Sequence, residues 1–151
     1  MNIKKTFIQV IPHEAQRLAS NVGDYWIDAF GTKHIRVSDT GNDDFNFLIQ
    51  LHEFLEEHLT RRRGLTEPEI QAFDEQFEQE QLDGLHSENA ESGFDPRSPY
   101  LREHMIATGI EMQLAGIMGL DWNDYENVVN TLGQDPPLKM KIEGVSQPDI
   151  R

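Results

Sequence analysis

Alternating apolar and polar positions near the N-terminus predict short strands. Three runs of this kind, each bounded by turn-forming residues, are expected: residues 5–11, 24–28 and 33–38. Gly31 lies between the second and third runs and can adopt the positive φ that a tight turn needs. In the third run Ile35 and Val37 mark the buried face, and Lys33 and Arg36 are expected to face solvent.

After these runs the apolar spacing changes from two residues to the three or four that are typical of a helix. Four helices are expected: residues 43–63, 66–82, 98–118 and 121–133. Their ends carry capping signals. Gly64 follows the first helix, Thr66 and Glu69 form a capping box on the second, and Ser98 with Pro99 suit the start of the third.

The remaining segments are identified by their lack of periodicity. Residues 83–97 are rich in Gly, Ser, Asn and Pro and are expected to form a long loop. Residues 134–151 contain three prolines and are expected to be a weakly ordered tail after a single domain of residues 1–133. Because strands precede helices, the predicted class is α+β: a small antiparallel sheet of about three strands with about four helices packed on it.

Composition restricts the classes of function. The net charge is −14 and the only tight basic run is 61–63, so nucleic acid and membrane surfaces are not expected as partners. The chain has no cysteine, which excludes disulfides and thiolate metal sites. It has no membrane-length apolar run and no signal-peptide core after the N-terminal lysines, so a cytoplasmic location is expected.

One predicted helix carries polar residues on its apolar side. In residues 51–58 (LHEFLEEH), a rotation of about 100° per residue places His52 and Glu56 within the apolar arc. Glu53 borders this pair, and Glu57 is expected to point to water. Residues four apart can hold one metal ion between them, as in the H-E-x-x-H motif. The likeness to this motif makes zinc the expected ion, and because a Glu replaces the second His, Mn²⁺ or Fe²⁺ are the alternatives.

The helix expected at residues 98–118 shows the same anomaly. His104 and Glu111 both lie between two groups of apolar positions on that helix. Buried ionisable groups are costly unless they are paired or bind a metal. If the two helices face each other, all of these groups are satisfied together. A divalent-metal site is therefore predicted, with His52, Glu56 and His104 as ligands and Glu111 as a fourth.

Simpler explanations exist for each of these residues. A His–Glu pair four residues apart commonly forms only a hydrogen bond, and His104 alone fits a core histidine with a local partner. His58 suits the C-terminal dipole of its helix and is predicted to be structural. Trp122 and Tyr125 are assigned to the core.

Several short stretches stand in a fixed order along the chain: IPH (11–13), QR (16–17), VGDYW (22–26), HIRVS (34–38), LHEFLE (51–56), AFD (72–74), SPY (98–100), EH (103–104) and GLDW (119–122). Together they resemble a family of small uncharacterised proteins of bacteriophages and bacterial genomes. The resemblance covers about residues 5–132. It implies a phage or bacterial origin and no particular activity.

The strand that precedes the H-E-x-x-E helix is similar to the arrangement in minimal zincin-type metallopeptidases. That resemblance implies that His52 is a metal ligand and that Glu53 is the general base that activates water. The chain departs from the zincin pattern at the second ligand, where Glu56 stands in place of His. The third ligand, His104, is assigned from helix faces and corresponds to no zincin motif.

Two hypotheses of function follow. The first is a metal-dependent hydrolase or peptidase that uses these ligands and Glu53. The second is a non-catalytic phage accessory protein that binds a basic host or phage protein, or mimics nucleic acid. It rests on residues 67–95, which contain ten acids and no Lys or Arg. A purely structural metal site is intermediate between them. An open coordination position would favour the enzyme, and a self-sufficient hydrogen-bond network would favour the accessory protein. Substrate and oligomeric state are not predicted.

Overall fold

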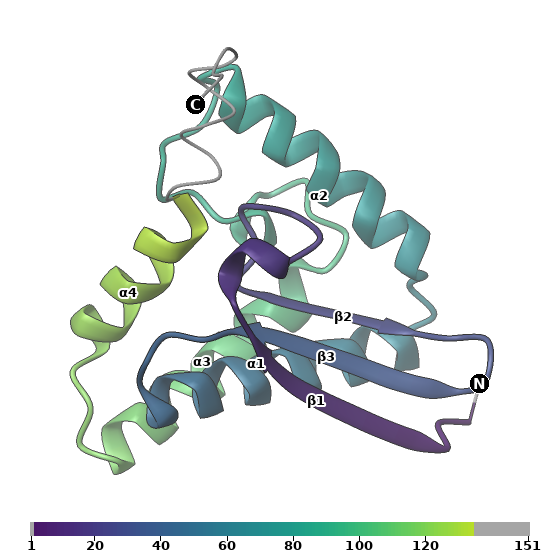
Figure 1. Cartoon of the computed structure of the whole chain (residues 1–151). Coiled ribbons are helices and arrows are strands. Elements are labelled where there is room, and N and C mark those ends of the chain that lie inside the picture. Colours follow the sequence, from purple (N-terminus) through teal and green to yellow (C-terminus); the bar gives the residue numbers. More distant parts are fainter. Residues whose placement is uncertain (1, 135–151) are drawn as a thin grey trace.

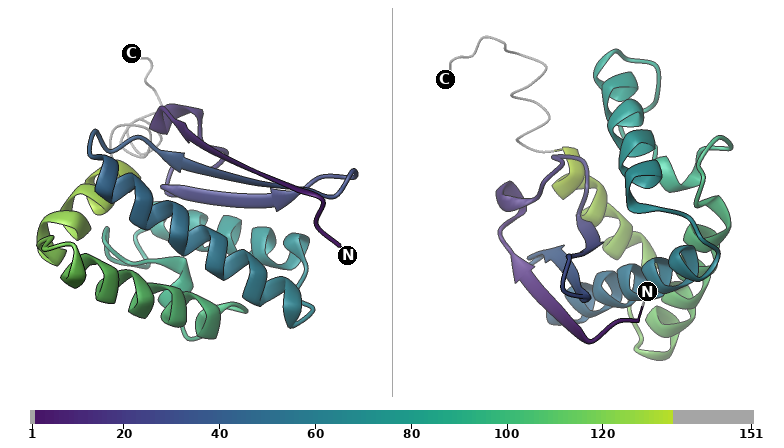
Figure 2. Two further views of the ribbon diagram at one scale, coloured as in Figure 1. Left: turned by 90° about the horizontal axis from the view of Figure 1, so that it is seen from below. Right: turned by 90° about the vertical axis from the view of Figure 1, so that its right-hand side faces the viewer.

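The computed structural model describes residues 2–134 and shows three strands followed by four helices (Figures 1 and 2). The strands are β1 (Lys5–Ile11), β2 (Gly23–Ile27) and β3 (Thr32–Ser38). The helices are α1 (Asp43–Arg62), α2 (Glu67–Leu82), α3 (Leu101–Ile117) and α4 (Trp122–Gln134). Two short 3-10 turns are η1 (His13–Ala15) and η2 (Ser92–Phe94). The α+β class predicted from the sequence is confirmed.

The sheet is mixed rather than wholly antiparallel. Its strand order is β1-β3-β2, so the last strand in the sequence lies in the middle. β2 and β3 form an antiparallel hairpin, whereas β1 pairs with β3 in parallel. Residues 12–22 connect β1 to β2, which runs in the opposite direction on the other side of β3. β3 therefore runs parallel to β1 and pairs with it along its remaining edge. The sequence pattern identifies strands but does not determine this pairing.

One face of the sheet packs on α1, and the alternation of β3 decides which residues lie there. Ile35 and Val37 are fully buried on this face. Because residues two apart share a face, Lys33 points the same way and is only 2% exposed. Its Nζ lies 2.7 Å from Glu57 Oε1 and donates to the carbonyl oxygen of Phe54 at 3.1 Å. The expectation that Lys33 faces solvent was therefore wrong.

Side-chain caps stabilise the first turns of α1 and α2. The Asn42 side chain accepts hydrogen bonds from the backbone N–H groups of Asp44 and Phe45. Thr66 and Glu69 form the reciprocal capping box expected at the start of α2. Both helices thus begin where their sequence signals place them.

α3 begins later than its sequence signals indicate. Its first residue is Leu101, and its N-cap, Tyr100, makes no side-chain capping bond. The Oγ of Ser98 accepts from the Tyr100 backbone N–H, and the Ser98 N–H donates to the carbonyl oxygen of Asp95. Ser98 and Pro99 therefore belong to a turn before the helix, and their expected roles as N-cap and first helical residue were wrong.

α1 is the central element of the fold. It contacts β2 and β3 on one side and α3 along another, so that α1 lies between the sheet and α3 (Figure 2). The main core cluster joins these layers to α4 and consists of Ile35, Val37, Phe45, Leu48, Ile49, Ala115 and Tyr125. This packing holds the side of α1 that carries His52 and Glu56 against α3.

Two sequence expectations concern the ends and surface of the fold. In the part of the chain that the structure describes, no helix has both the length and the apolarity of a membrane span. The tail expected at residues 134–151 lies outside the described residues, apart from Gln134 at the end of α4.

Candidate metal centre

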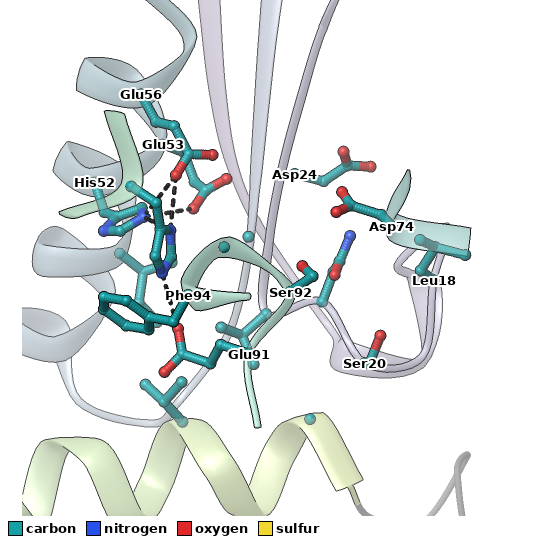
Figure 3. Close-up of a pocket in the computed structure, with 18 of the residues that line it drawn as sticks. Leu18, Ser20, Asp24, His52, Glu53, Glu56, Asp74, Glu91, Ser92 and Phe94 are labelled. Carbon is teal, nitrogen blue, oxygen red and sulfur yellow. Dashed lines mark hydrogen bonds and ion pairs between the residues drawn. The ribbon is translucent and has the colours of Figure 1, made fainter. Parts of the chain in front are cut away.

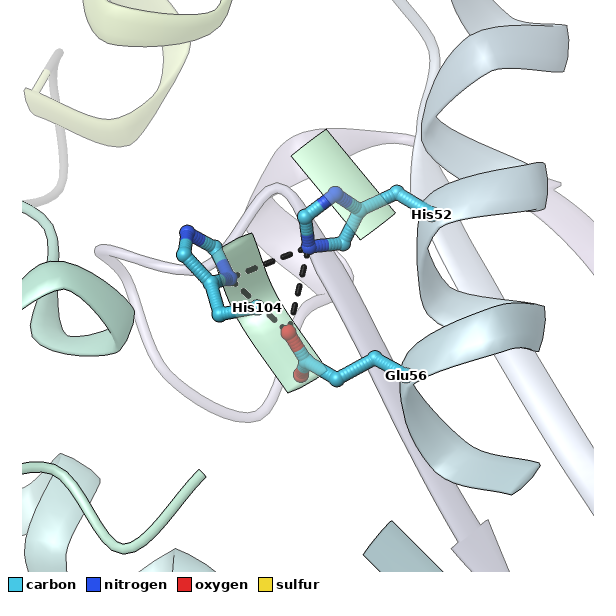
Figure 4. A group of neighbouring side chains, drawn as sticks. All are labelled: His52, Glu56 and His104. Carbon is cyan, nitrogen blue, oxygen red and sulfur yellow. Dashed lines mark hydrogen bonds and ion pairs between the residues drawn. The ribbon is translucent and has the colours of Figure 1, made fainter. Parts of the chain in front are cut away.

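Three polar side chains from α1 and α3 converge on one point (Figure 4). His52 Nε2 lies 3.1 Å from His104 Nδ1 and 3.1 Å from Glu56 Oε2. His104 Nδ1 lies 2.8 Å from the same oxygen of Glu56. All three side chains are buried. The structure thus brings together the three residues that the helix faces predicted as ligands, in a triangle of ligand-type atoms.

Helix geometry explains this convergence. His52 and Glu56 are one turn apart on α1, so both point toward α3. His104 lies in the first turn of α3 and points back toward α1. The extensive packing of α1 along α3 fixes the distance between the two sets.

The outer nitrogen of each histidine is held by a carboxylate. His52 Nδ1 lies 2.7 Å from Glu111 Oε1, and His104 Nε2 lies 3.1 Å from Glu91 Oε1. Tyr125 in turn donates its hydroxyl to Glu111. A carboxylate behind each ring fixes its tautomer and orientation, as is usual for metal-binding histidines.

Glu111 therefore has a different place from the one expected. It was predicted as a fourth ligand, but it lies behind His52 and outside the triangle. The second oxygen of Glu56 is also held from behind, because the Tyr25 hydroxyl donates to Glu56 Oε1 at 3.0 Å. Each corner of the triangle is thus oriented by a neighbour, and one atom of each points inward.

The inward atoms need a proton or a metal ion between them. If Glu111 and Glu91 each accept a hydrogen bond from the outer N–H of the histidine that they face, His52 Nε2 and His104 Nδ1 present lone pairs toward each other and toward Glu56. Three acceptors within about 3 Å of one another in a buried site repel unless a proton or a metal ion lies between them. The chemistry of this donor set therefore fits a bound cation.

The pKa values show how strongly the site favours positive charge. Burial lowers the pKa of His104, but its hydrogen bonds to Glu56 and Glu91 outweigh this effect and raise the pKa to about 9. Burial raises the pKa of Glu56, but hydrogen bonds from His104 and His52 outweigh it and lower the pKa to about 2. The carboxylate stays charged, and protons occupy the nitrogens when no metal does.

The size of the triangle also fits a metal. For bonds of about 2.1 Å, ligand atoms are separated by about 3.4 Å in a tetrahedral site and by about 3.0 Å on an octahedral face. The observed separations are 2.8 to 3.1 Å. A slight opening would admit zinc, and two His with one carboxylate on one face also suits Fe²⁺ or Mn²⁺. These separations are also ordinary hydrogen-bond lengths, so the same three atoms can be joined by protons when no metal ion is bound.

Glu53 lies beside the triangle without joining it. Its Oε2 is 4.0 Å from His52 Nε2, and its side chain is mostly buried. Burial and then the charge of Glu56 raise the pKa of Glu53 to about 8. A Cβ on Gly23 would come within 2.6 Å of the Glu53 side chain, so this glycine leaves the room that Glu53 occupies. Glu53 is therefore a carboxyl group with weak charge compensation at the edge of the site.

Glu57 does not point to water, contrary to the expectation. It is 3% exposed and pairs with Lys33, and Arg61 Nε contacts its other oxygen at 2.8 Å. The cause is that β3 covers this side of α1 and supplies the buried Lys33. Glu53 and Glu57 thus do differ in environment, but Glu57 belongs to a structural ion pair.

A cavity of about 470 Å³ reaches the triangle (Figure 3). Its walls come from the loop before β2, from α1, α2 and the loop that carries Glu91, and from α3 and α4. Gly93 in that loop lies against the His104 ring, where a Cβ would come within 2.4 Å of ring atoms. A substrate-sized space thus adjoins the candidate ligands.

The remaining histidines have separate partners. His58 is exposed and contacts Arg61, which agrees with a structural role. Three others make hydrogen bonds away from the triangle: His13 with Ser38, His34 with Asp28 and His86 with Glu80.

Several residues of the site were not found from the sequence. Glu91 lies in an aperiodic loop, and nothing in its local sequence marks it. Tyr125 was assigned to the core, where it lies, but its hydroxyl also holds Glu111. Tyr25 carried a usable signal, because it is paired with Ile35 in the hairpin and therefore shares the buried face toward α1.

Comparison with known proteins does not assign the chain to a group: no family model, curated protein or solved structure matches it.

Proposed function

We propose that this chain is a metal-dependent hydrolase of zincin-like design. His52, Glu56 and His104 bind one divalent ion, zinc or alternatively Mn²⁺ or Fe²⁺, and Glu53 is the general base. The observation that carries the proposal is the buried triangle of inward-pointing atoms, in which each histidine is oriented by a carboxylate behind it. A carboxylate-oriented pair of histidines with a third ligand is typical of metal sites.

The roles of the other residues follow from their positions. Such an ion supplies Lewis acidity and lowers the pKa of water. Glu53, 4.0 Å from His52 Nε2 and outside the triangle, is positioned to take a proton from water and deliver it to a leaving group. A cation in the triangle would favour the charged form of Glu53 and bring its pKa down toward neutral pH. The adjoining cavity admits the substrate.

The likeness to zincins and to the phage and bacterial family rests on the quoted sequence stretches. Phage or bacterial origin and a cytoplasmic location are part of the same proposal.

Internal pairing makes the partner-binding hypothesis less favoured. Several acids of residues 67–95 already have partners within the described chain. Glu80 and Asp95 both pair with Arg97, and Glu91 contacts His104. Recruitment of a basic protein therefore remains the second proposal, without a surface that singles it out.

The test of catalysis uses fluorescently labelled casein and protein loaded with zinc or manganese. Glu53→Gln should reduce hydrolysis by about 100-fold or more, the usual contribution of a general base, and should leave one bound ion per chain. An active wild type with an equally active Glu53→Gln variant would contradict the assigned base. A loaded but inactive wild type would favour a structural metal site.

A further inference from the structure

The cavity extends well beyond the metal centre. In Figure 3, Asp24 and Asp74 lie across the open space from His52 and Glu56. The volume of about 470 Å³ exceeds what a metal ion and its waters need and falls within the range of small-ligand sites. A substrate bound at the metal centre would therefore extend toward the far wall.

This far wall is acidic. Besides the carboxylates of the metal centre, six others line the cavity: Asp24, Glu67, Asp74, Glu75, Glu88 and Glu126. Among the described lining residues the sole Lys or Arg is Arg17. Arg17 already binds Asp24 through two hydrogen bonds of 2.6 and 3.0 Å. The net charge that a ligand meets is therefore negative.

The environment of Asp74 favours the binding of a cation. Its carboxylate accepts from the Tyr100 hydroxyl and has Ser92 as a second hydroxyl partner. Within the described residues no Lys, Arg or His forms an ion pair with it, although Glu80 of α2 and Asp95 of the following loop do have such pairs. Burial raises the pKa of Asp74 to about 7, because it outweighs the lowering by the hydrogen bonds from Tyr100 and Ser92, and the charges of Glu56 and Asp24 add to it. An entering ammonium or guanidinium group would relieve this cost.

Tyr100 links the two ends of the cavity. Its hydroxyl contacts Asp74 and Ser92, and its ring lies edge-on to the ring of His104, with centroids 6.2 Å apart. One side chain, that of Tyr100, thus reaches from Asp74 to the neighbourhood of His104, so a substrate side chain of similar length can do the same. The acidic wall and the metal centre can contact the same substrate residue.

We infer that the cavity selects a substrate that carries a cationic side chain, of the lysine or arginine type, whose charged end pairs with Asp74 while its carbonyl group lies at the metal centre. The inference rests on the proposed metal-dependent function. Phosphorylated or carboxylate-bearing substrates are disfavoured, because they would meet like charge on most of the far wall.

The test uses hydroxamates, which bind divalent metals directly, with zinc-loaded protein and isothermal titration. The probes are acetohydroxamate and the Nα-acetyl hydroxamates of lysine, norleucine and glutamate, in which only the side chain differs in charge. The lysine probe should bind about tenfold more tightly than the norleucine probe, as expected for a charge-assisted pair in a partly buried site, and the glutamate probe should bind more weakly than both.

Two variants locate the preference. Asp74→Asn should make the lysine and norleucine probes bind equally, since the amide keeps the shape and removes the charge. Asp83→Asn is the matched control, because Asp83 lies outside the cavity lining, and it should keep the preference.

The outcomes separate the two proposals. If acetohydroxamate does not bind zinc-loaded protein, the proposed metal centre fails. If it binds but the wild type does not distinguish the lysine probe from the norleucine and glutamate probes, the metal centre stands and the inference is overturned. A lysine preference that persists in Asp74→Asn would overturn the role of Asp74.

Discussion

Two glutamates four residues apart on α1 show how the environment of a residue decides its role. Glu53 has no ion pair with a Lys or Arg within the described residues, and burial raises its pKa to about 8. Glu57 is paired with both Lys33 and Arg61. Glu53→Gln removes the free-energy cost of burying a carboxyl group without a cationic partner. Glu57→Gln removes the attraction of that carboxylate to Lys33 and Arg61.

The stability of the metal-free protein should therefore respond in opposite directions. Glu57→Gln should lower the free energy of unfolding by about 3 kcal/mol, because it leaves Lys33 buried without its partner. Glu53→Gln should leave it unchanged or raise it. Urea unfolding followed by circular dichroism measures both, and equal destabilisation by the two variants would mean that Glu53 is also structurally paired.

The site also predicts a pH dependence for the metal-free protein. The folded-state pKa of His104, about 9, and that of Glu53, about 8, are both above their ordinary values of 6.5 and 4.5. The folded state therefore binds more protons than the unfolded state in this range, and stability should fall as pH rises from about 5 to 9. Glu56, with a pKa of about 2, acts oppositely and loses its contribution as pH falls from about 4.5 to 2.

Metal should change this profile. Zinc or manganese at about 100 times its dissociation constant should add about 2.7 kcal/mol at pH 8, which is roughly 10 °C in the melting temperature. At pH 5 the effect should largely vanish, because protons compete for the same nitrogens. A melting temperature that is independent of metal across this range would contradict the account.

At the scale of elements, the site depends on how α3 and the loop before it rest against α1. Gly93 in η2 gives the His104 ring its space, since a Cβ there would come within 2.4 Å of the ring. Gly109 in α3 has nothing within 4 Å of such an atom. The two glycines thus form a matched pair for testing the position of the ring.

Gly93→Ala should displace His104 and weaken metal binding, measured by titration, by tenfold or more in the dissociation constant, about 1.4 kcal/mol. Gly109→Ala should leave metal binding unchanged and stabilise the fold by about 0.5–1 kcal/mol, because alanine favours the helix. If Gly93→Ala binds metal as wild type does, the ring is not held by η2.

The elements themselves were largely predictable, and their contacts were not. The capping signals of Asn42 and Thr66 are local, so α1 and α2 start where the sequence indicates. The parallel pairing of β1 with β3 and the burial of Lys33 depend on contacts between distant segments. The same holds for the candidate site. Helix periodicity finds His52, Glu56 and His104, but Glu91 comes from a loop without periodicity.

For the whole molecule, the acidic composition has an internal as well as an external consequence. Part of the net charge of −14 faces the cavity, where it would attract a divalent ion and a cationic substrate. The binding rate of either should fall as salt rises, because screening weakens this attraction. Acidic residues that the sequence suggests lie on the outer surface thus also line the candidate site.

The central claim is that His52, Glu56 and His104 bind one divalent ion. The most direct measurement is elemental analysis of the purified chain after exposure to zinc or manganese and removal of excess metal. The account predicts about one ion per chain in wild type and in His58→Ala, and none in His104→Ala. No retained ion in a folded wild type, or equal retention by His104→Ala and His58→Ala, would contradict it.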